Sequence, residues 1–84
     1  MSRIQCPCCG FFPFESFSQA DNHICKICFW QYDTVAHDYP DISIGPNRIP
    51  LNEAKKNYIK YGVYDQQFKD RVREPLEIEF PENN

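Results

Sequence analysis

Two pairs of cysteines constrain the fold of this 84-residue chain more than any other feature. Cys6 and Cys9 stand three positions apart, Cys25 and Cys28 repeat that spacing, and fifteen residues separate the pairs. Two cysteines at this spacing on a tight turn can direct both sulfurs at one ion, and a second such turn completes a tetrahedron. Gly10 suits a backbone that must turn with positive φ after the second cysteine. The spacing predicts one four-thiolate site, with Zn²⁺ as the expected ion and iron as the alternative.

The size of the chain explains why a metal ion would be needed. We expect residues 1–84 to form one domain, near the size at which a core alone supplies only a few kcal/mol. The hydrophobic content of 42% and the aromatic content of 15% are enough for a small core beside the ion. The chain should therefore fold, with the ion as a staple.

The net charge and the N-terminal residues indicate which binding partners and which cellular location to expect. A net charge of −3 disfavours general binding to a phosphate backbone, which needs clustered lysine and arginine. No apolar run approaches a membrane span, and the N-terminal residues lack the apolar region of a signal peptide. An odd count of five cysteines disfavours a pure disulfide framework. We therefore expect no membrane association and a cytoplasmic location, where thiols stay reduced and bind metal.

The order of turns and periodic segments predicts an α+β zinc ribbon. Its parts are a small antiparallel β-sheet on two zinc knuckles, an irregular loop, one or two short helices and a C-terminal strand. In residue numbers, these parts are the ribbon over 1–32, the loop over 33–50, the helical part over 51–73 and the strand over 76–80.

Helical spacing begins at Leu51. Ala54, Tyr58 and Tyr61 follow it on one stripe of a helix, and Gly62 suits a left-handed cap. Asp65 can then cap a second, shorter helix. The last segment, Leu76 to Phe80, alternates apolar and acidic residues, which predicts a half-buried strand with an acidic edge at Glu77 and Glu79.

Several motifs occur in a fixed order along the chain. They are CPCCG, then CxxCFW, then LNEAKKNYIKYG and VREP. Through these motifs, the chain resembles the cysteine-rich CPCC family over residues 5–75. The resemblance implies a small bacterial, zinc-ribbon-like protein without an established enzymatic activity. Some similar proteins look like companions of toxins in interbacterial competition loci, which would imply an immunity role.

The resemblance also implies roles for individual residues. The four cysteines of the C-x2-C pairs match the metal-binding positions, and Cys8 matches the extra cysteine that gives the family its name. The chain departs from the pattern at Lys26, where proline is expected, and at Gln31, where an acidic residue is expected. The first change should leave the site intact. The second weakens any mechanism that needs a carboxylate there and leaves Asp33 as the nearest candidate.

Cys8 and His23 are accessory candidates beside the predicted ligands. Cys8 could be a free thiolate, acidified by the ion and acting as a nucleophile or redox sensor. It could instead be a small packed residue or an alternate ligand, and no suitable histidine–aspartate partner is evident nearby in sequence. His23 shares a strand face with Cys25, so it could hydrogen-bond a ligand, or it could be a structural or surface histidine.

Three function classes can be compared. A metal-dependent hydrolase could use His37 and Asp38, but it needs an ion with an open coordination position, which four thiolates do not leave. A nucleic-acid-binding ribbon could use the lysines of the predicted first helix, yet these match a normal solvated helix face with acidic flanks. We therefore expect a non-enzymatic module that binds a basic protein partner, such as a nuclease toxin. The predicted contact residues are Trp30, Asp33, Asp38, Tyr39 and Asp41.

Overall fold

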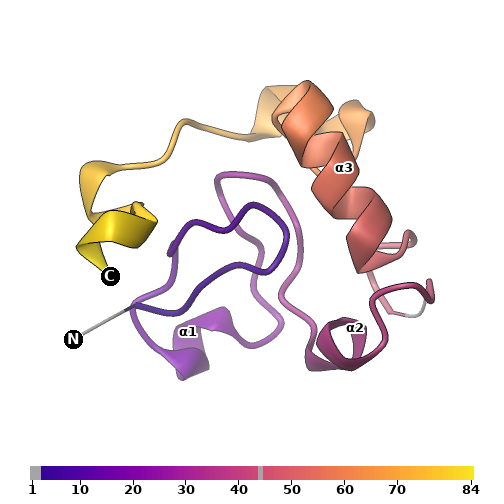
Figure 1. Ribbon diagram of the computed structural model, residues 1–84, viewed down its shortest axis with the longest axis horizontal. Coiled ribbons are helices and arrows are strands. Elements are labelled where there is room, and N and C mark those ends of the chain that lie inside the picture. Colours follow the sequence, from indigo (N-terminus) through magenta and orange to yellow (C-terminus); the bar gives the residue numbers. More distant parts are fainter. Residues whose placement is uncertain (1–2, 44) are drawn as a thin grey trace.

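The computed structural model describes residues 3–43 and 45–84. The two cysteine-bearing turns lie at the centre, with α3 across one side and the C-terminal segment on the other (Figure 1). Within these described residues, three α-helices and three short 3₁₀ helices follow one another. They are α1 (Phe17–Ala20), α2 (Thr34–Asp38), α3 (Leu51–Tyr61), η1 (Gln66–Arg71), η2 (Glu77–Glu79) and η3 (Pro81–Asn83).

The two cysteine pairs lie on turns of the same kind. The Gly10 N–H donates to the Cys6 carbonyl at 2.9 Å, and the Phe29 N–H donates to the Cys25 carbonyl at 2.8 Å. Both donor residues have positive φ, 84° at Gly10 and 72° at Phe29. Glycine adopts this conformation without steric cost, whereas it is uncommon for phenylalanine. The Phe29 ring packs on Phe68 with 4.8 Å between centroids, so a distant contact helps to hold the second turn.

The predicted antiparallel sheet is wrong. Within residues 3–43 and 45–84 there is no β-strand, and the segments beside the turns meet only at the isolated bridges Ile4↔Phe14 and Ile24↔Gln31. Each bridge is followed by a helix and not by a longer ladder, since α1 begins at Phe17, three residues after Phe14, and α2 begins at Thr34, three residues after Gln31. Beside Gln31, the side-chain amide of Asn47 replaces a neighbouring strand, since it accepts from the Gln31 N–H at 2.8 Å and donates to the Gln31 carbonyl at 2.9 Å.

The predicted loop over 33–50 contains the helix α2. Asp33 begins this helix, because its carboxylate accepts from the Val35 N–H at 2.9 Å and so satisfies a free donor of the first turn. Ala36 is buried and anchors the helix to the core. Five residues are too few to produce a helical apolar period, so the spacing carried no signal of this element.

The helix α3 lies where the apolar spacing predicts it. Leu51 and Ala54 are buried, and Gly62 ends the helix in the left-handed region with φ of 77°. The predicted second helix is the 3₁₀ helix η1, whose first turn is capped by the Asp65 carboxylate. α3 contacts the first cysteine turn through an edge-to-face pair between Phe11 and Tyr58, with ring centroids 6.4 Å apart.

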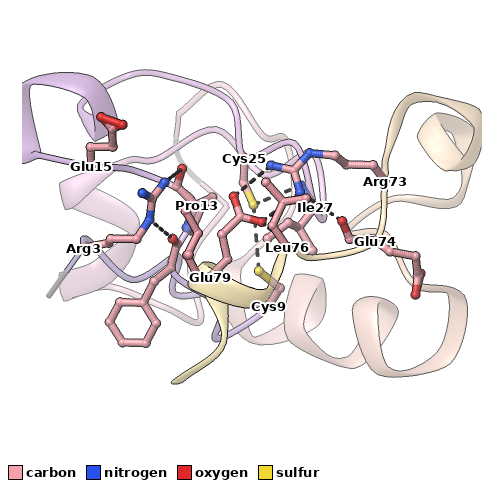
Figure 2. Close-up of polar contacts among 12 residues, drawn as sticks. Arg3, Cys9, Pro13, Glu15, Cys25, Ile27, Arg73, Glu74, Leu76 and Glu79 are labelled. Atoms are coloured by element: carbon pink, nitrogen blue, oxygen red, sulfur yellow. Dashed lines mark hydrogen bonds and ion pairs between the residues drawn. The ribbon is translucent and has the colours of Figure 1, made fainter. Parts of the chain in front are cut away.

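The predicted C-terminal strand over 76–80 is also wrong, and the burial of its residues departs from the predicted alternation. The segment forms η2, in which Leu76 and Ile78 are 53% and 57% exposed, whereas Glu79 is 1% exposed. Arg73 accounts for the burial of Glu79, because its guanidinium donates to both carboxylate oxygens of Glu79 at 2.8 Å (Figure 2). The Glu79 carbonyl also accepts from the Phe12 N–H at 2.8 Å, which joins the segment to the first cysteine turn.

The core lies around the cysteine turns and against α3. Its largest fully buried apolar side chains are those of Trp30, Ile27 and Val63. Within the described residues, no helix has the length and apolar character needed to cross a membrane.

Candidate metal centre

The side chains of four cysteines converge on one point. The Sγ atoms of Cys6, Cys9, Cys25 and Cys28 all lie within 4.8 Å of one another. The Cys6–Cys28 sulfur distance is 3.5 Å, and the Cys9–Cys25 distance, drawn in Figure 2, is 3.8 Å. Four sulfurs bound tetrahedrally to an ion at roughly 2.3 Å would lie about 3.8 Å apart. The cluster therefore fits a four-coordinate metal ion of that size.

The electrostatics of the cluster favour a bound cation. Cys6, Cys25 and Cys28 are 0% exposed. Burial raises the pKa of the Cys6 and Cys28 thiols, whereas hydrogen bonds with neighbouring thiols, Cys28 first, lower the pKa of Cys25. Four thiolates so close together and so far from water would repel one another strongly unless a cation lay between them. The Ile27 N–H, 3.4 Å from the Cys25 sulfur, donates to it and spreads part of its charge.

An ion pair that sequence reasoning missed lies beside the cluster. Figure 2 shows Arg73 and Glu79 next to Cys25. Hydrogen bonds to Glu79 raise the pKa of Arg73, and the negative charge of Cys25 raises it further. Four thiolates around a divalent ion keep two negative charges, so the nearby guanidinium offsets part of them. Arg73 belongs to the VREP motif, which in the sequence indicated only the family resemblance.

The accessory candidates lie outside the cluster of four. Cys8 is 6% exposed and is part of the buried core. His23 is exposed, and its Nδ1 lies 3.0 Å from the Asp21 carbonyl oxygen. His37 is exposed on α2, and its ring is 5.1 Å from that of Tyr32. Within the described residues, no histidine belongs to the metal-binding cluster.

The predicted partner-contact residues divide into three groups. Asp38, Tyr39 and Asp41 are exposed, and Tyr39 keeps 55% of its surface in solvent. Asp33 is half-buried and caps α2, so its carboxylate has a structural role. Trp30 is 1% exposed, and its predicted place on a contact surface is corrected, because the core encloses its ring.

Comparisons with known proteins add one finding. A family model described as "Cysteine-rich CPCC" matches residues 4–79, which include all four clustered cysteines and both members of the Arg73–Glu79 ion pair. Searches of curated proteins and of solved structures found no significant match.

Proposed function

The chain belongs to the cysteine-rich CPCC family, and from this premise we propose that it is a non-enzymatic, zinc-stapled module that binds a protein partner. The observation that carries the metal part is the convergence of four cysteine sulfurs within 4.8 Å. Zn²⁺ is the proposed ion because it favours tetrahedral four-thiolate sites. Four protein ligands leave no coordination position for a substrate, which supports a structural role for the ion.

The metal content tests this proposal directly. We expect the purified protein to carry one Zn²⁺ per chain and to be colourless, because the filled d-shell of zinc gives no visible bands. Elemental analysis measures the amount of zinc per chain, and a visible absorption spectrum checks that the protein is colourless. A red protein would show that the bound ion is iron, and a folded protein without metal would overturn the proposal.

The proposed partner surface is acidic and partly apolar. Asp38, Tyr39 and Asp41 are exposed at and just beyond the end of α2, and the apolar side chains of Val35 and Ile42 are 46% and 51% exposed in the same part of the chain. Tyrosine and apolar contacts supply binding energy, while aspartates select a basic partner. The finer proposal is that the partner is a toxin, so that the protein acts as its immunity protein, as the family resemblance implies. The free cysteines support the reducing cytoplasm as the compartment.

Charge reversal tests the partner surface. Replacing Asp38 and Asp41 together with lysine is expected to weaken partner capture at least tenfold, because a basic partner would then face like charges. Added salt should weaken capture by the unsubstituted protein as well. The thermal midpoint should change little, since both side chains are exposed. Capture is measured by pulldown of the partner with and without nuclease treatment.

A matched control separates the surface from total charge. Replacing Glu77 and Glu82 with lysine changes the net charge equally, from −3 to +1, at exposed positions in the C-terminal segment. This control variant should retain the partner. Equal loss of capture in both variants would refute the proposed surface.

Nucleic-acid binding is the second candidate, since Lys55, Lys56 and Lys60 are all exposed on α3. Tight, salt-sensitive binding of DNA or RNA by the metal-loaded protein, with no protein partner recovered, would favour this alternative.

A further inference from the structure

Cys9 differs from the other clustered cysteines in its exposure. Cys6, Cys25 and Cys28 are 0% exposed, whereas Cys9 is half-buried. Cys9 is therefore the most accessible of the four residues to a reagent in solution, and reaction at a thiolate requires such access.

A surface hollow leads to Cys9. Its volume is about 520 Å³, and Pro7, Cys8 and Gly10 of the first cysteine turn line it on one side. Lys55 and Tyr58 of α3 line the other side. Lys55 is exposed and, within the described residues, forms no ion pair, so its positive charge is available to attract anionic reagents into the hollow.

We propose that Cys9 is a modification site, at which a thiol-reactive compound or peroxide entering this hollow reacts first, and that Cys25 then forms a disulfide with it. The inference rests on the proposed Zn²⁺ centre. The Cys9 and Cys25 sulfurs are 3.8 Å apart, so a small movement brings them to the S–S bond length of about 2.05 Å. Loss of two of its four ligands releases the ion and, with it, the folding energy that the ion supplies.

The oxidation balances with peroxide as the only co-reactant. The Cys9 thiolate attacks one peroxide oxygen, the O–O bond breaks, hydroxide leaves, and the sulfur becomes a sulfenic acid. The Cys25 thiolate then attacks that sulfur, the S–O bond breaks, and a second hydroxide leaves. The two thiolates lose two electrons in total, and peroxide gains two.

Cys8 is not the expected disulfide partner, although it lines the same hollow. Adjacent residues joined by a trans peptide have Cα atoms 3.8 Å apart, below the usual 4.4–6.8 Å of disulfide-linked residues, so a Cys8–Cys9 disulfide would be strained.

Alkylation tests the hollow. The protein is treated with limiting iodoacetate, which is anionic, or iodoacetamide, which is neutral, and each labelled cysteine is located by peptide mass spectrometry. We expect Cys9 to be labelled first by both reagents. Lys55→Glu should lower the ratio of the iodoacetate rate to the iodoacetamide rate at Cys9 about threefold or more. Lys56→Glu is the matched control, since Lys56 does not line the hollow, and it should leave the ratio near that of the unsubstituted protein.

Peroxide tests the disulfide. Hydrogen peroxide is added stepwise to the zinc-loaded protein. The amount of released zinc, measured with a chromogenic chelator, should rise in proportion to the amount of Cys9–Cys25 disulfide, measured by non-reducing peptide mapping. The Cys8→Ala variant should also release zinc when peroxide is added, and it should form the same Cys9–Cys25 disulfide. First labelling at a cysteine other than Cys9, or a first disulfide that contains Cys8, would overturn the inference.

Failure of the proposed function is distinguishable from failure of this inference. The metal content of the starting protein is measured first, and a protein without metal refutes the zinc centre. In that case the order of alkylation still tests the hollow at Cys9. A zinc-loaded protein that reacts first elsewhere refutes the inference alone.

Discussion

Replacing Cys25 with serine is expected to leave the chain unfolded or only partly folded at 25 °C. Structural zinc supplies on the order of 10–16 kcal/mol of apparent folding energy in small zinc domains, whereas a core of this size supplies only a few kcal/mol. Cys25 is 0% exposed and its sulfur accepts the Ile27 N–H, so the substitution exchanges a buried thiolate ligand for a neutral hydroxyl that binds the ion poorly. Circular dichroism, zinc content and amide dispersion in a ¹H–¹⁵N spectrum measure the result.

Cys8→Ser is the matched control for this substitution. Cys8 is nearly as buried, at 6% exposure, but its sulfur is not one of the four clustered ligands. This variant should fold and keep one zinc per chain, with a loss of about 1 kcal/mol, typical of a single substitution. Zinc loss in Cys8→Ser as severe as in Cys25→Ser would contradict the ligand assignment.

Replacing Arg73 with methionine is expected to lower the free energy of unfolding by about 2 kcal/mol, because it leaves the buried Glu79 carboxylate without its partner, while the 36% exposure of the Arg73 side chain reduces the effect below that of a fully buried pair. Glu79 is 1% exposed and also accepts the Leu76 N–H at 2.7 Å. The substitution should therefore free the C-terminal segment from the first cysteine turn. Chemical denaturation measures the stability, and faster hydrogen exchange at the Phe12 amide, which donates to the Glu79 carbonyl, reports the local release.

A second substitution separates the charge from the shape of the pair. Adding Glu79→Gln to Arg73→Met removes the unpaired charge and keeps a side chain of similar size, so stability should recover by about 1–2 kcal/mol. If the double variant is no more stable than the single one, the unpaired charge is not the cause of the destabilisation.

The ion pair also sets the sign of a pH effect. Hydrogen bonds from Arg73 hold the pKa of Glu79 below its usual value of 4.5. A carboxylate with a lowered pKa stabilises the fold fully above its unfolded pKa, and this contribution is lost as the pH falls through the folded pKa. The stability difference between the unsubstituted protein and Arg73→Met should therefore be complete at pH 7 and should narrow as the pH falls toward 4.5 and below.

Local sequence patterns determined several parts of this protein. The C-x2-C spacing placed four cysteines that the structure brings together, and the ordered motifs identified a family that the match over residues 4–79 confirms. The apolar period, with Gly62 as its left-handed end, located α3. Each of these patterns acts over a few neighbouring residues, because turns, caps and helix faces are short-range features. Zinc as the ion and a protein as the partner stay predictions.

Only the tertiary structure decided the remaining features. The alternation over 76–80 predicted that Glu79 would face solvent, yet a bidentate pair with Arg73 buries it, and Leu76 and Ile78 are exposed. Asn47 takes the place of a strand beside Gln31, sixteen residues away, and Phe29 keeps a positive φ while it packs on Phe68. These conformations depend on which distant residue each side chain contacts in the folded protein, and a local sequence pattern does not contain that residue. The spacing of the cysteines could therefore place the candidate metal centre, whereas the elements around it were set by contacts between segments distant in sequence.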